Sequence, residues 1–121
     1  MANLGMKDSF DFDEETVDAQ VTKESPGNFA LGFVNDAKAF VVFYVGRADA
    51  DLNKEIKKHI GEDVKYRRFK YSYAASPKEA FEKECKNYHD FGGDRKKLRN
   101  TKHPESPEKS DWVCPVCNKV V

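Results

Sequence analysis

The 121-residue sequence predicts a small α/β (α+β) domain with a three-stranded, mainly antiparallel sheet, flanking helices and an irregular C-terminal tail. Three observations predict this class. Two apolar runs flank a short turn, a helical repeat follows them, and an aromatic-rich run precedes a second helix with clear capping residues. This mixed order of strands and helices is typical of a single small domain with one sheet.

The two apolar runs predict a β-hairpin, with strands at about 28–34 and 39–45 joined by a turn at Asn35–Asp36. The second run, "AFVVFYV", is apolar on both faces, so we expect it to be the central, buried strand, ended by Gly46. A third strand is expected within 64–74, where aromatic and β-branched residues recur.

Two helices are expected. In the first, at about 51–60, apolar residues recur at every fourth position and form one buried stripe. The second runs to about residue 91. Ser76 is expected as its N-cap, Pro77 as its first residue and Glu79 as the partner in a capping box.

The segments outside 26–103 are expected to differ from the domain. Residues 1–25 are acidic and are predicted to be mostly disordered, although "DFDEETVDAQVT" can pair with a partner or an edge strand. Residues 104–121 carry a C-x-x-C motif. No apolar stretch is long enough to predict a signal peptide or a membrane span, so a cytoplasmic location is expected.

Charge is segregated along the chain, although the formal total is zero. Residues 1–26 hold two basic and seven acidic side chains, a net of −5, and residues 54–102 hold fifteen basic and eight acidic, a net of +7. The basic half can attract the phosphates of DNA or RNA, and the acidic segment can compete for the same face. The alternative is a well-solvated surface without a polyanion partner.

Four segments in order carry a resemblance to a known family: "GNFALGF" on one strand, "YVG" on the next, a helix with the pattern L-x-x-x-I-x-x-H, and the glutamate-bearing "KEAFEKE". Together they resemble the GIY-YIG nuclease domain over residues 26–103. That family cuts phosphodiester bonds in DNA. The resemblance implies tyrosines near the attacking water, an arginine on the first helix and a glutamate that holds Mg²⁺ or Mn²⁺.

The match departs from the family at two positions. Phe29 stands in place of the first-strand tyrosine and has no hydroxyl, and Lys54 or Glu55 stands in place of the helix arginine. Glu84 matches the metal-binding glutamate, and the resemblance requires it to share a phosphate-accepting pocket with Tyr44. The candidate catalytic residues are Tyr44, Gly46, Arg47, Lys54, His59 and Glu84.

These departures predict a nuclease-like domain that binds nucleic acid and is catalytically weakened or inactive. The alternatives are an active metal-dependent endonuclease and a protein-interaction module. Simpler interpretations of the single residues also stay open: Tyr44 and Gly46 can end a core strand, and Glu84 can be a solvated helix residue. The expected phosphate-contacting residues are Lys54, Lys57, Lys58, Arg67, Arg68 and Lys70.

The cysteines suggest a second site. "WVCPVCN" places Cys114 and Cys117 at a spacing that lets two thiolates bind one tetrahedral metal ion. Cys85 and His89 are four residues apart on the second helix, hence on one face, and complete a possible Cys₃His zinc site. His103 is the alternative fourth ligand, and free thiols are the alternative to zinc.

Overall fold

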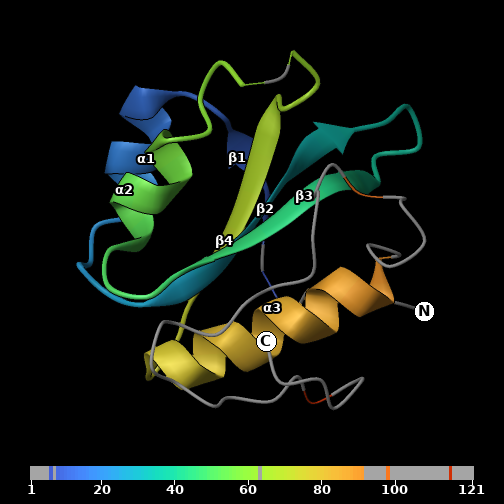
Figure 1. Ribbon diagram of the computed structural model, residues 1–121. Helices are drawn as coiled ribbons and strands as arrows, with labels where there is room; N and C mark the ends of the chain where they lie inside the picture. The colour runs from blue at the N-terminus through green and yellow to red at the C-terminus, as the bar shows by residue number, and fades with distance from the viewer. Residues whose placement is uncertain (1–5, 7, 63, 92–97, 99–114, 116–121) are drawn as a thin grey trace.

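The computed structural model describes residues 6, 8–62, 64–91, 98 and 115, which form a four-stranded antiparallel sheet and three helices (Figure 1). The strand order is β1-β4-β2-β3, and every pair is antiparallel. The elements are β1 (Phe10–Asp11), α1 (Glu14–Gln20), β2 (Gly27–Val34), β3 (Phe40–Ala48), α2 (Leu52–Lys57), β4 (Arg68–Tyr73) and α3 (Pro77–Asp90). The predicted α+β class is therefore confirmed, with β2, β3 and β4 as the three expected strands.

Helices cover both faces of the sheet. Figure 1 shows α1 and α2 together on one side and α3 on the other, and we call these the α1/α2 face and the α3 face. The main apolar cluster fills the α1/α2 face and consists of Val17, Val21, Phe29, Leu31, Ala48, Leu52, Ile56, Tyr66 and Phe69. A smaller cluster on the α3 face consists of Ala30, Val45, Tyr88 and Leu98.

The central strand is β2, not β3 as the sequence predicts. β2 pairs with β4 on one side and β3 on the other, and six of its eight residues are buried. β3 is the outermost of the described strands on its side of the sheet, and its first five residues are only partly buried. "AFVVFYV" is apolar on both faces because helices cover both faces, which does not require a central position.

A β-bulge in the hairpin changes which residues of β3 share a face. Leu31 pairs with Tyr44 and Gly32 pairs with Val42, so Phe43 is the extra residue. Because of this insertion, Phe43 and Tyr44 both pack against the α1/α2 cluster, although they are adjacent in the chain. The predicted turn is present: Asn35 Oδ1 accepts hydrogen bonds from the backbone N–H groups of Ala37 and Ala39 at 2.9 and 3.0 Å.

The prediction that residues 1–25 are mostly disordered is wrong for the described part of that segment. Asp13 caps α1 by accepting the Thr16 N–H at 2.7 Å, and Val17 and Val21 are buried in the α1/α2 cluster. β1 pairs with β4 through Phe10 and Asp11, as the alternative of edge-strand pairing expects. Two valines at this spacing suffice to dock a short helix, although the segment is polar overall.

The two predicted helices are present, and the second has its expected N-cap. Asp51 accepts the Lys54 N–H at the start of α2, and Ser76 accepts the Glu79 N–H at 3.2 Å at the start of α3. Glu79 Oε2 in turn accepts the N–H of Ala75, which completes the reciprocal cap one residue earlier than the sequence predicts. Among the helices of the described residues, each is too short or too polar to cross a lipid bilayer.

Candidate functional site

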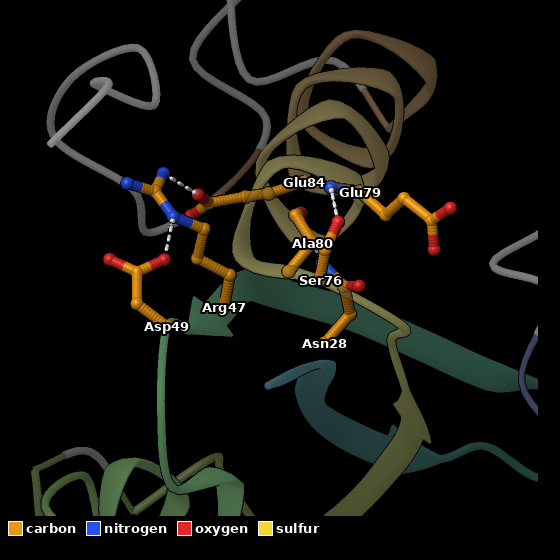
Figure 2. A network of polar contacts seen from close by, with 7 residues as sticks. All are labelled: Asn28, Arg47, Asp49, Ser76, Glu79, Ala80 and Glu84. Atoms are coloured by element: carbon orange, nitrogen blue, oxygen red, sulfur yellow. Dashed lines mark hydrogen bonds and ion pairs between the residues drawn. The ribbon is translucent and has the colours of Figure 1, made fainter. Parts of the chain in front are cut away.

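Arg47 lies at the centre of a charged network between β3 and α3. Its Nη1 donates to Glu84 Oε1 at 2.7 Å and its Nε donates to Asp49 Oδ1 at 2.9 Å, as Figure 2 shows. The guanidinium also lies 5.1 Å from the centroid of the Phe81 ring. The side chains of Arg47 and Glu84 are only 13% and 10% exposed, so the pair is largely removed from water.

Burial and ion pairing act against each other in this network. Burial raises the pKa of Glu84 to about 7, and the Arg47 guanidinium opposes this rise without cancelling it. Burial also disfavours the charged form of Arg47, but the Glu84 and Asp49 carboxylates outweigh it, so the pKa of Arg47 is raised. At neutral pH the network therefore holds one guanidinium between a carboxylate and a carboxyl group close to its titration point.

Two buried amides add to the polar character of this interface. Asn28, which is fully buried in β2, donates from Nδ2 to the Ala80 carbonyl at 2.8 Å (Figure 2). The Asn28 Oδ1 and the Nδ2 of Asn87, which is 1% exposed on α3, have no hydrogen-bond partner among the residues that the structure describes. Unsatisfied buried polar atoms are costly, so the contact of α3 with the sheet is less complementary than the opposite layer.

Tyr44 lies in an aromatic cluster on the α1/α2 face. Its ring centroid is 4.8 Å from that of His59 and 6.1 Å from that of Phe29. Glu62 Oε1 lies 2.8 Å from His59 Nδ1. Burial raises the pKa of Tyr44 to about 12, and Glu84 is the charge that adds most to this rise.

Tyr44 and Glu84, which the resemblance requires to share one pocket, pack against different elements of the described structure. Tyr44 packs with α2-side residues, whereas Glu84 is engaged with Arg47 above the Phe81 ring of α3. The two side chains therefore belong to opposite faces of the sheet, although Glu84 is within electrostatic range of the Tyr44 hydroxyl. Residues 44 and 47 are three apart on one strand and alternate between faces, so Tyr44 and the Arg47–Glu84 pair pack on different sides of β3. A phosphate-accepting pocket shared by Tyr44 and Glu84 stays a prediction.

The other candidate catalytic residues also lie in different surroundings. A Cβ atom on Gly46 would lie 2.4 Å from the Phe29 ring, so a close packing contact is sufficient to explain this glycine. Lys54 is exposed on α2, and Glu55 pairs with Lys58 at 3.3 Å. Arg47 does not replace the missing helix arginine beside Tyr44, because its guanidinium lies on the α3 face.

The predicted phosphate-contacting residues do not form one continuous surface. Three of them lie on or next to α2, while Lys70 lies on the α3 face with its ammonium 5.2 Å from the Phe40 ring centroid. The acidic segment neutralises two of the six: Asp18 pairs with Lys57 at 2.7 Å and Asp11 pairs with Arg68 at 2.6 Å. The acidic segment thus pairs with two of the cations that were predicted to contact phosphates.

Only two of the proposed zinc ligands lie within the described residues. Cys85 is fully buried on α3 and His89, one turn later, is half-buried. Cys114, Cys117 and His103 lie outside the described residues. Within the described part of the chain, no group of three or more His, Cys, Asp or Glu side chains is arranged to hold a metal ion. Glu84 fits a divalent cation poorly, because a cation there would have to displace the Arg47 guanidinium.

A shallow groove between α1 and α2 was not anticipated from the sequence. It has a volume of about 410 Å³ and is lined mainly by polar and charged residues, including Lys23, Lys54 and Lys57 with Asp18. The sequence analysis also missed the roles of Asp49, Asn28 and Asn87. Asn28 had a detectable signal, because a polar residue inside an otherwise apolar strand requires an internal partner.

No family model, curated protein or solved structure matches this chain, so its function is argued from the geometry of its own residues.

Proposed function

We propose that this chain is a GIY-YIG-like domain that binds DNA or RNA and in which phosphodiester cleavage is weakened or lost. The observation that carries the proposal is the Arg47–Glu84 pair. The glutamate that the resemblance assigns to a metal ion is 8% exposed and is bonded to a guanidinium at 2.7 Å. A cytoplasmic location is part of the same proposal.

The weakened chemistry follows from three positions. Phe29 is 1% exposed and offers no hydroxyl to orient a water molecule. The charge of Arg47 is already shared by two carboxylates, so little of it is left for a phosphate. Loss of one contact that stabilises transition-state charge typically costs roughly 10²–10³ in rate. Two altered contacts therefore favour binding without efficient turnover.

Binding rests on the cations that remain open to solvent. Lys54, Lys58 and Arg67 are exposed, and Lys58 makes a 3.3 Å ion pair with Glu55 on the same helix. Exposed pairs of this kind contribute little, so a phosphate can replace the carboxylate. Phosphate contacts of lysine and arginine release counterions and make affinity depend steeply on salt concentration.

The binding test compares two charge-matched double variants. A fluorescein-labelled oligonucleotide is titrated with Lys54→Ala/Lys58→Ala and with Lys78→Ala/Lys86→Ala, since Lys78 and Lys86 are exposed on α3. We expect the α2 variant to bind more weakly and to lower the salt slope by about 2, because each lost phosphate contact removes about 1. An equal loss of affinity in both variants would mean that only net charge matters and that α2 is not the binding surface. If the wild type does not bind the oligonucleotide at low salt, the proposal is refuted.

A cleavage test addresses the active-nuclease alternative. Plasmid DNA is incubated with Mg²⁺ or Mn²⁺ and the wild type, Glu84→Ala or Glu82→Ala, a neighbouring glutamate on the same helix. We expect no more than trace cutting, with all three proteins equal. Cutting that is lost in Glu84→Ala and kept in Glu82→Ala would establish an enzyme and overturn the weakened-chemistry part of the proposal.

Zinc is a separate proposal, supported by the burial of Cys85 one turn from His89 on α3. Structural zinc would be held by these two residues with Cys114 and Cys117, and it would tie the C-terminal segment to the helix. Elemental analysis of purified protein, with Cys114→Ser as the control, is expected to give one zinc per chain in the wild type only. A wild type without zinc would retract the four-ligand set.

A further inference from the structure

The turn end of the β2–β3 hairpin carries a pair of stacked aromatic rings. The centroids of Phe33 and Phe43 are 5.4 Å apart and their planes differ by 29°. Both side chains are partly exposed, and Phe43 lies on the same face as Phe33 because it is two residues after Val41, the cross-strand partner of Phe33. Large apolar rings that stay in contact with water on a folded domain are candidates for a binding surface.

This end of the sheet lies away from α2. Leu52, the first residue of α2, contacts the opposite end of β2, where a Cβ on Gly27 would lie 2.7 Å from its side chain. Figure 1 shows the hairpin turn extending beyond the pair of helices α1 and α2. Two further apolar side chains near this end are exposed, Val34 at 40% and Val64 at 89%.

Cations surround the two rings. The Lys65 ammonium lies 5.8 Å from the centroid of Phe43. The backbone N–H of Arg67 donates to the Gly32 carbonyl at 2.8 Å, so the backbone of this exposed arginine lies beside β2 one residue before Phe33. The turn 35–39 and the segment 64–67 together hold three cations, Lys38, Lys65 and Arg67, against a single acid, Asp36. Basic residues therefore outnumber acidic ones in these two short segments beside the rings.

We propose that Phe33 and Phe43, with Lys65 and Arg67 beside them, form a platform that stacks the bases of single-stranded nucleic acid. The inference rests on the proposed function and narrows it from nucleic acid to unpaired strands. Aromatic rings accept bases of any sequence on their faces, while neighbouring cations follow the backbone phosphates. A duplex keeps its bases stacked on one another and cannot use these rings.

The test uses the full chain and two probes, a fluorescein-labelled dT 20-mer and a blunt duplex of 20 base pairs. The variants are Phe33→Leu and Phe40→Leu. Phe40 is a matched control, because it is a partly exposed phenylalanine on the α3 face with the Lys70 ammonium 5.2 Å from its ring. We expect Phe33→Leu to bind the dT 20-mer roughly fivefold or more weakly with an unchanged salt slope, because the loss is one of stacking. Phe40→Leu should stay within about twofold of the wild type.

A second variant covers the case in which Phe33→Leu unfolds the hairpin. Phe33→Trp enlarges the stacking face, so we expect it to keep or increase affinity for the dT 20-mer. Its indole fluorescence should be quenched on binding by more than that of the wild type, whose single tryptophan is Trp112. Absence of additional quenching, together with unchanged affinity, would place the bound strand elsewhere.

The outcomes separate the two proposals. If the wild type binds the dT 20-mer and Phe33→Leu binds equally well, the platform is refuted while nucleic-acid binding stands. Tighter binding to the duplex than to the dT 20-mer also refutes the platform alone. If the wild type binds neither probe at low salt, both proposals fail, and a peptide-binding role for the exposed rings becomes the better explanation.

Discussion

The two faces of the sheet are built on different principles. The α1/α2 face is closed by nine buried side chains that are all apolar or aromatic, with six further partly buried aromatic rings packed around them. The α3 face has a cluster of four buried apolar residues, and its contact with the helix includes Asn28, Glu84 and Asn87. Burial of apolar area is the dominant stabilising contribution, so we expect most of the free energy of folding to come from the α1/α2 face.

This difference teaches what the polar interface can and cannot contribute. A buried ion pair adds little net stability, because the desolvation of both charges offsets their attraction, whereas removal of one partner is costly. The α3 face therefore fixes the position of the helix more than it stabilises the domain. The Arg47–Glu84 pair and the Asn28–Ala80 hydrogen bond are directional contacts that hold α3 in one register against β2 and β3.

The largest effect is expected from a truncation on the α1/α2 face. Phe29→Ala should lower the free energy of unfolding by about 4 kcal/mol, because it removes a ring that packs against Gly46, Tyr44 and His59 and leaves a cavity. Urea denaturation measures the loss. The comparison is Val45→Ala, a fully buried residue of the α3 cluster, for which about 2 kcal/mol is expected. A greater loss in Val45→Ala would reverse the ranking of the two faces.

The next effect belongs to the ion pair and depends on pH. Arg47→Met should cost about 3 kcal/mol at pH 8, because it leaves the Glu84 carboxylate buried without its cation. At pH 5 the cost should be smaller, since Glu84 takes up a proton and its charge disappears. Stability curves at the two pH values test this. A cost that is the same at both would mean that Glu84 is neutral or solvated throughout.

The stability of the wild type should itself depend on pH through Glu84. The pKa of Glu84 is about 7 in the folded protein, above its ordinary value of 4.5, so between these values the folded chain holds a proton that the unfolded chain has released. Stability from this group is therefore greatest below pH 4.5 and falls as the pH rises to about 7, by about 3 kcal/mol. Glu84→Gln should flatten this decline, and Glu82→Gln on the same helix should not.

The smallest expected effect tests whether the acidic segment belongs to the α1/α2 face. Val17→Ala should lower the free energy of unfolding by about 2 kcal/mol, because Val17 is fully buried between α1 and the sheet. Val64→Ala makes the same chemical change at a residue that is 89% exposed and should stay within about 0.5 kcal/mol. Equal losses of unfolding free energy in the two variants would mean that α1 is not part of the core. The prediction of a disordered segment would then hold.

The sequence was informative where local signals act alone. The Asn35–Asp36 turn, the two apolar runs beside it, the fourfold apolar repeat at 51–60 and the Ser76 cap predicted elements within a few residues of β2, β3, α2 and α3. The acidic segment was misjudged, because composition outweighed the two valines that dock α1. The candidate catalytic set was assembled from motif order alone, and motif order carries no information on which face of a sheet a residue occupies.

What the sequence by itself determined is the local conformation of the chain, since periodicity, caps and turn residues act through neighbours a few positions away. Only the tertiary structure decided that β2 is central and β3 outermost, that α1 joins the core, and that Tyr44 and Glu84 lie on opposite faces. These features depend on contacts between residues far apart in the chain. The one-residue bulge at Phe43 also changes the face on which the following residues of β3 lie, and no local sequence pattern predicts it.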